Sequence, residues 1–135
     1  MKNRAFAGKT FEALFDNKDL SGAELLQVST TESAVLWNQF GNFQQETLPD
    51  PFQQSPIYAS WNDGSSVWLA GGADAVHTSI GRQESFCGGI LTQEQGSLRY
   101  GPLPHVLRGS VRQFLPVKDQ LLVLLNDGPV LRISH

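Results

Sequence analysis

The sequence predicts an all-β fold made of short antiparallel strands, and two repeats point to it. The segment Phe-Gly-Asn-Phe at 40–43 returns as Gln-Gly-Ser-Leu at 95–98, and Leu-Pro follows each copy at the same distance. The apolar run at 67–71 is matched by a second run at 122–126. Both displacements are roughly 55 residues, close to the length of one four-stranded blade. We therefore predict sheets of the β-propeller type.

The composition suits short strands joined by turns. The chain has 135 residues, enough for a single domain with one core. Charged residues make up only 17%, whereas 13 Gly and 7 Pro supply many turns. The net charge is −3 without a Lys/Arg cluster, so nucleic acid is not an expected partner. Nor do we expect membrane insertion or a signal peptide, because no apolar run is long enough.

One short helix is expected over residues 6–16. Phe11, Leu14 and Phe15 are spaced three and four apart, as on one face of a helix. The remainder of the chain has the pattern of strands, and we place a partial blade at 24–49. Its expected strands are 25–29, 34–37 and 42–48. A loop with two prolines follows.

A complete blade is expected at 55–104 and a second partial blade at 109–135, all within one repeat domain. The complete blade has expected strands at 57–61, 67–70, 89–92 and 98–100. The last has expected strands at 111–115, 121–125 and 130–133. About ten strands make about two and a half blades, too few for a closed ring. Either the chain is part of a longer propeller, or copies associate to complete a ring, or the strands close into a different barrel; we favour the first two together.

The order of these motifs resembles the FG-GAP (VCBS) repeat proteins. The residues that carry the likeness are 40–43, 68–72, 80–82 and 109–112. The likeness runs from about Phe6 to the C-terminus and is strongest to the last blades of large bacterial members. It implies a seven- or eight-bladed propeller related to the integrin α-subunit head. It also implies an exported or cell-surface protein that binds partners or glycans, although the sequence leaves the compartment open.

The calcium loop of that family is not preserved here. Calcium needs six or more closely spaced oxygen ligands. With the family's glycine placed on Gly64, Asp63 takes the third acidic position, while the other acidic positions fall on Ala59, Trp61 and Val67. One carboxylate cannot supply such a shell. We therefore predict no metal and no cofactor.

The tryptophans are the candidate contact residues within strands. Trp37 and Trp68 lie inside strand patterns and are expected to pack between blades. Trp61 lies beside the Asn-Asp-Gly turn, where an aromatic ring can stack on a sugar or anchor a partner. We therefore count Trp61 as a candidate ligand-binding residue.

The long polar loop after the second strand of the complete blade supplies the other candidates. Loops on a rigid scaffold often carry function. The charged and titratable residues that we select there are Asp74, His77, Arg82 and Glu84. A solvated loop without function is the alternative interpretation of the same residues.

No catalytic constellation stands out, so we predict a non-enzymatic module that binds protein or glycan, or a structural part of a larger propeller. The alternative is a hydrolase-like enzyme that uses His77 with Cys87 or Ser79. No Gly-x-Ser-x-Gly motif surrounds a serine in that loop. The single Cys87 cannot form an internal disulfide and suits a small packed side chain.

Overall fold

The computed structural model describes residues 8–10, 13–15, 21–24, 26–73 and 86–134. The chain divides into two compact units, 1–31 and 32–135. In the first unit the described residues form turns and irregular chain, apart from Ala13, which is in 3₁₀ conformation and whose N–H donates to the Thr10 carbonyl at 3.1 Å. Of the helix predicted over 6–16, residues 6, 7, 11, 12 and 16 lie outside the described residues. Residues 8–10 and 13–15 do not form it, and Gly8 has a φ of 76°, which a right-handed helix does not accommodate.

The strand predicted over 25–29 is not formed by residues 26–29. These residues are irregular, and the side chains of Leu26 and Val28 are 79% and 73% exposed. An apolar run becomes a strand only where a neighbouring strand pairs with it and one face is buried. Among the described residues no strand pairs with this run.

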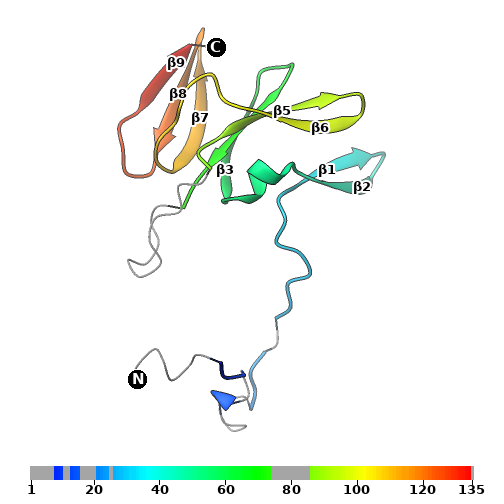
Figure 1. The fold of residues 1–135 in the computed structure, drawn as a ribbon. Helices are drawn as coiled ribbons and strands as arrows, with labels where there is room; N and C mark the ends of the chain where they lie inside the picture. Colours follow the sequence, from blue (N-terminus) through cyan, green and yellow to red (C-terminus); the bar gives the residue numbers. More distant parts are fainter. Residues whose placement is uncertain (1–7, 11–12, 16–20, 25, 74–85, 135) are drawn as a thin grey trace. The chain divides into compact units, whose positions relative to one another are not determined.

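The second unit is all-β, with nine strands in three antiparallel sheets among its described residues (Figure 1). The first sheet pairs β1 (Ala34–Gln39) with β2 (Asn42–Thr47). The middle sheet has the order β3 (Ile57–Asn62), β4 (Val67–Gly71), β5 (Gly89–Glu94) and β6 (Ser97–Gly101). The last sheet has the order β7 (Val111–Val117), β8 (Gln120–Leu125) and β9 (Leu131–Ser134).

The predicted all-β class is thus confirmed, and the middle sheet has a strand at each of the four places predicted between residues 57 and 100. A single turn of 3₁₀ helix, η3 (Asp50–Gln53), lies in the segment predicted as a loop. Within the part of the chain that is described, no helix is long and apolar enough to cross a membrane. The three sheets follow one another without closing into a ring.

The first sequence repeat corresponds to one structural hairpin that occurs twice. Phe40 and Gly41 join β1 to β2 with φ angles of 53° and 93°, and Gln95 and Gly96 join β5 to β6 with 50° and 80°. Two successive residues at positive φ are the mark of the tight type I′ turn, which matches the twist of paired strands. The first sheet is therefore equivalent to β5–β6, with Gly41 placed on Gly96. We call this correspondence the hairpin repeat.

The second repeat relates β3–β4 to β7–β8. The Gly72 N–H donates to the Pro56 carbonyl at 3.1 Å, where β4 leaves the sheet. The Asn126 N–H donates to the Ser110 carbonyl at 2.9 Å, where β8 leaves its sheet. These two bonds occupy the same place in the middle and last sheets, so Gly72 is placed on Asn126. We call this correspondence the blade repeat.

The similarity of the two apolar runs predicts that 67–71 corresponds to 122–126, and this prediction is wrong by one residue. The structure aligns 67–71 with 121–125. Side chains alternate between the two faces of a strand, so a shift of one residue exchanges every side chain between faces. The register is fixed by pairing with β3 and β7, which the similarity of two apolar runs does not reveal.

A bulge interrupts the first strand of both sheets at equivalent positions. Tyr58 is the extra residue in β3, and Arg112 is the extra residue in β7. Each bulge reverses the alternation of side chains, so that Ile57 and Ala59 belong to opposite faces of the middle sheet. The two bulged residues meet, because the Arg112 guanidinium lies 4.2 Å from the centroid of the Tyr58 ring.

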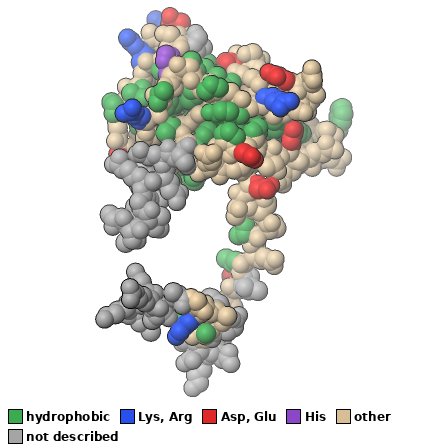
Figure 2. All heavy atoms as spheres, viewed as in Figure 1, with side chains coloured by type: hydrophobic (Ala, Val, Ile, Leu, Met, Phe, Trp, Pro, Cys, Tyr) green, Lys and Arg blue, Asp and Glu red, His purple; other side chains and the backbone are tan. Residues whose placement is uncertain are grey.

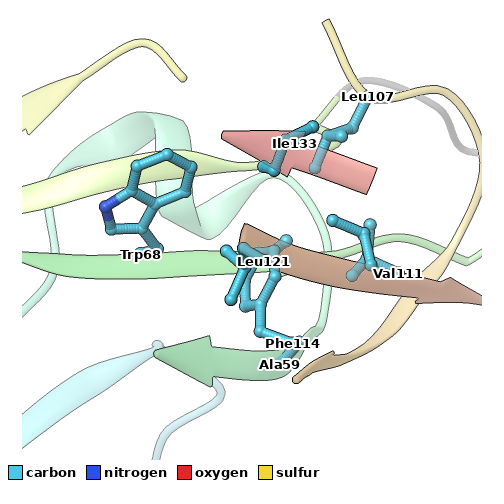
Figure 3. Packing of buried hydrophobic residues seen from close by; sticks show 9 residues of the cluster. Ala59, Trp68, Leu107, Val111, Phe114, Leu121 and Ile133 are labelled. Carbon is cyan, nitrogen blue, oxygen red and sulfur yellow. The ribbon is translucent and has the colours of Figure 1, made fainter. Parts of the chain in front are cut away.

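Within the middle sheet, β4 is buried on both faces. On the face toward the last sheet, Trp68 and Ala70 pack against a cluster that includes Phe114 and Leu121 (Figure 3). The rings of Trp68 and Phe114 meet edge to face at 6.5 Å. On the opposite face, Leu69 packs with the residues under the first sheet and η3. Those residues are Leu48, Phe52, Phe86 and Leu91.

Gly71→Ala is expected to destabilise the second unit. A Cβ at this position would overlap the Pro56 carbonyl oxygen, which accepts the bond from Gly72. Overpacking of this kind costs about 1–3 kcal/mol or more, and the obstacle here is backbone. Urea unfolding, followed by tryptophan fluorescence, should show a lower midpoint. Gly101→Ala is the control, because the nearest atom to its Cβ is 3.8 Å away. Equal midpoints for both variants would contradict the close packing of β4 on Pro56.

Candidate functional site

The structure describes only one of the five predicted site residues. Trp61 is half-buried on β3, and its ring meets the Trp68 ring edge to face at 5.4 Å. It packs against the cluster shared with the last sheet. The other four predicted site residues lie outside the described residues; they are Asp74, His77, Arg82 and Glu84.

Of the three residues named for the enzyme alternative, the structure describes one. His77 and Ser79 lie outside the described residues, whereas Cys87 is half-buried just before β5. Cys87 and His105 both line a hollow of about 230 Å³. Sharing a hollow places two groups in one region but does not make a nucleophile and a base, which need hydrogen-bond contact.

A larger hollow lies between the first sheet and the middle sheet. Its volume is about 510 Å³, within the range of ligand pockets. Nearly all of the side chains that line it are apolar, and they come from both sheets. They are Ser33, Ala34, Val35, Trp37, Leu48, Ile57, Val67, Leu69 and Leu91.

A second, polar hollow adjoins the first at Trp37. Its volume is about 190 Å³, and Trp37, Val67 and Leu91 line both hollows. Hydroxyl and amide side chains supply its polar groups; they are Asn62, Ser65, Ser66, Thr92 and Gln93. We call the two adjoining hollows the Trp37 groove. It has an apolar part and a polar part, which share Trp37 as a lining residue.

Trp37 is half-buried in this groove. Its Nε1–H donates to the Glu46 carboxylate at 2.7 Å, across the first sheet. Core packing was predicted for Trp37 and Trp68, and only Trp68 is in the core, at 5% exposure. The difference arises because the first sheet has two strands among the described residues, and two strands cover the middle sheet incompletely.

Gln53 of η3 fixes the start of β1. Its amide Nε2 donates to the carbonyls of Ser33 and Leu48, and its Oε1 accepts from the Ser33 N–H at 2.7 Å. The amide thereby ties the residue before β1 to the residue after β2, at the open end of the hairpin. Sequence reasoning placed this glutamine in a loop and assigned it no role, since these partners are 20 and 5 residues away.

The outer edge of β1 is the main-chain component of the site. The Leu48 N–H donates to the Ser33 carbonyl at 3.0 Å, so Ser33 bonds toward β2. Successive residues of an edge strand direct their main-chain groups to opposite sides. The groups of Ala34 and Leu36 therefore face the other side, where no described strand pairs with β1. In the middle sheet, β4 covers the equivalent edge of β5.

Asp63 closes the turn at the polar end of the groove. Its Oδ1 accepts from the N–H and Oγ of Ser65 and from the N–H of Ser66, all at 2.7–2.8 Å. Its Oδ2 accepts from the Ser66 Oγ at 2.8 Å and from the Trp68 Nε1–H at 3.1 Å. These bonds, the Ser65 N–H foremost, hold the pKa of Asp63 well below its ordinary value.

Both oxygens of this carboxylate thus serve its own turn. Among the described residues, no group of three or more His, Cys, Asp or Glu side chains could hold a metal ion. The predicted lack of calcium remains a prediction, now with a physical reason at the position that retains the family's acidic residue.

Comparison of the chain with protein-family models, with curated proteins and with solved structures gave no match. The resemblance to FG-GAP repeat proteins therefore stays a prediction.

Asp63→Ala is expected to lower stability in a pH-dependent way. The pKa of Asp63 is depressed in the folded state, so its contribution is complete above about pH 5 and is lost as the pH falls below about 4. The difference in unfolding free energy between wild type and variant should be constant from about pH 5 to 7 and should shrink below about pH 4. Asp119→Ala, in the turn of the last sheet, controls for the loss of one surface charge. A difference that grows on acidification would contradict the ionised, bonded Asp63.

Proposed function

We propose that this chain is a non-enzymatic repeat module of the β-propeller type, which binds an extended apolar segment of a protein partner along β1. The observation that carries the proposal is the uncovered edge of β1 beside the apolar part of the Trp37 groove. Main-chain groups at a sheet edge supply affinity for an added strand, and a pocket for alternate side chains supplies specificity.

The middle sheet indicates which strand would fit. There β4 pairs with β5, with Trp68 opposite Ile90 and Leu69 opposite Gly89. By the hairpin repeat, these positions of β5 correspond to Val35 and Ala34 of β1. A strand like β4 on β1 would direct its tryptophan toward the middle sheet and into the hollow. The preferred ligand is therefore an extended segment with a large apolar side chain at that position.

The propeller-type architecture is part of the same proposal. It is supported by the hairpin repeat, by the blade repeat and by the burial of β4 on both faces of the middle sheet. Membership of the FG-GAP family, an exported or cell-surface location and a larger propeller to which these sheets belong follow from the sequence resemblance. They are proposed on that ground.

A glycan is the second candidate ligand, favoured by the polar part of the groove. The Trp37 ring beside the polar groups of Asn62, Thr92 and Gln93 combines a stacking surface with hydrogen-bonding side chains. Sugar recognition uses this combination. The larger, apolar hollow offers few such groups, which places the peptide ligand first.

A labelled peptide with the sequence of residues 64–72, which include β4, tests the strand-binding function. Fluorescence anisotropy should show saturable binding to the full chain. Replacement of the tryptophan in the peptide by alanine should weaken binding by about tenfold or more, equivalent to about 1.4 kcal/mol, because the ring would no longer fill the hollow. Equal binding of both peptides would contradict the proposal.

Ala34→Pro tests the edge itself. Proline removes the N–H that faces the open side of β1 without removing a bond to β2, and its ring blocks an added strand. Peptide binding should weaken by about tenfold or more, with the far-ultraviolet circular dichroism unchanged. Ala34→Ser is the matched control and should bind within about twofold of wild type. Binding that survives Ala34→Pro would exclude strand addition at this edge.

The glycan candidate has a separate test. A glycan array probed with the full chain should show binding that Trp37→Ala abolishes and Trp37→Phe largely retains, because phenylalanine keeps an aromatic face. Binding unaffected by Trp37→Ala would exclude the groove as a glycan site.

A further inference from the structure

The last sheet exposes apolar side chains on the face that points away from the middle sheet. Leu115 and Val117 on β7 are 43% and 42% exposed, and Leu122 and Leu124 on β8 are half-buried. The side chains that alternate with these on the two strands, such as Phe114, Leu121 and Val123, point the other way and belong to the cluster shared with the middle sheet. We call these four residues, Leu115, Val117, Leu122 and Leu124, the leading face.

The blade repeat shows what the leading face corresponds to. It places Leu122 and Leu124 on Trp68 and Ala70 of β4. Trp68 and Ala70 are buried because the last sheet packs on them. The leading face therefore repeats the surface of the middle sheet that receives a following sheet.

The first sheet exposes the complementary surface. Leu36 and Phe43 are 61% and 65% exposed on the face of β1–β2 opposite to Val35. By the hairpin repeat, they are equivalent to Leu91 and Leu98 of the middle sheet, which pack toward the first sheet. We call Leu36 and Phe43 the trailing face, because it repeats the surface that packs on a preceding sheet.

We infer that a second copy of this chain binds with its trailing face on the leading face of the first copy. The arrangement repeats, between two molecules, the contact that already joins the middle sheet to its neighbours within one molecule. Two different surfaces meet in it, so the association is head-to-tail and either closes into a ring or continues.

The charges of the two faces are compatible with this contact. We compared the described strand residues whose side chains point to the same side of the sheet as the leading face or the trailing face. Among them, Arg132 carries a charge, and the rest are apolar or neutral polar. Like-charge repulsion therefore does not oppose the contact. Figure 2 shows apolar side chains gathered at the surface of the sheets, with charged side chains scattered between them.

The inference rests on the repeat architecture of the proposed function and not on the Trp37 groove. The groove opens between the first and middle sheets, whereas both association faces lie on outer surfaces. Peptide binding to the groove can therefore fail or succeed independently of self-association.

Analytical ultracentrifugation of variants tests the head-to-tail contact. The full chain should show a mass that increases with concentration. A trailing-face variant, Leu36→Ser with Phe43→Ser, and a leading-face variant, Leu115→Ser with Val117→Ser, should each associate at least about tenfold more weakly and sediment as monomers. Val106→Ser is the control, since Val106 is exposed outside both faces and its loss should leave association unchanged.

Mixing the two variants gives the decisive result. Each variant retains one intact face, so an equimolar mixture should form a one-to-one dimer although each variant alone is monomeric. A mixture that stays monomeric while the wild type associates would overturn the inference. Association of one variant by itself would indicate a symmetric contact through its intact face and would also overturn it, as would a wild type that stays monomeric at all concentrations.

A second pair of substitutions guards against loss of folding. Leu36→Lys and Leu115→Glu each add one charge at an exposed position, and circular dichroism verifies that both variants fold. Each variant alone should be monomeric, because association would bury the new charge against the apolar face of the other copy without an opposite charge beside it. Their mixture should associate through the new ion pair in a salt-dependent manner. Failure of this mixture and of the serine pair together would exclude the contact.

Discussion

Burial of β4 on both faces of the middle sheet is the constraint on which the rest of this structure depends. A sheet with one wet face has alternating apolar and polar residues, whereas β4 is apolar throughout, from Val67 to Gly71. Trp68 and Ala70 face the last sheet, and Leu69 faces the first. Such a strand is stable only between two neighbours, so the first and last sheets are required partners of the middle sheet.

The bulges in β3 and β7 change which side chains point to which face of their sheets, and this allows the packing on both faces. If Tyr58 were a regular strand residue instead of a bulge, Ile57 and Ala59 would share one face of β3, and one neighbouring sheet would lose an apolar contact. With the bulge, each side chain meets a different sheet. Arg112 does the same in β7 and lies over the Tyr58 ring, so the two irregular positions also support each other.

Apolar sheet surface that no neighbouring sheet covers forms both the Trp37 groove and the leading and trailing faces. The first sheet has two described strands over a middle sheet of four, and the space left beside β1 is the apolar part of the Trp37 groove. The leading and trailing faces arise differently, from sheets whose outer sides repeat buried surfaces of the middle sheet. A groove with an uncovered strand edge favours an extended ligand, whereas a broad apolar face favours another sheet.

The sequence by itself determined the all-β class, the four strands of the middle sheet, the repeated tight turns and the burial of Trp68. These features are encoded locally, by glycine in the turns at Gly41 and Gly96 and by apolar runs of strand length. Tertiary structure alone decided the alignment of β4 with β8, the bulge at Tyr58, the role of Gln53 and the partial exposure of Trp37. Each of these depends on which strand lies alongside and how much of it is covered, and residues distant in the sequence supply that contact.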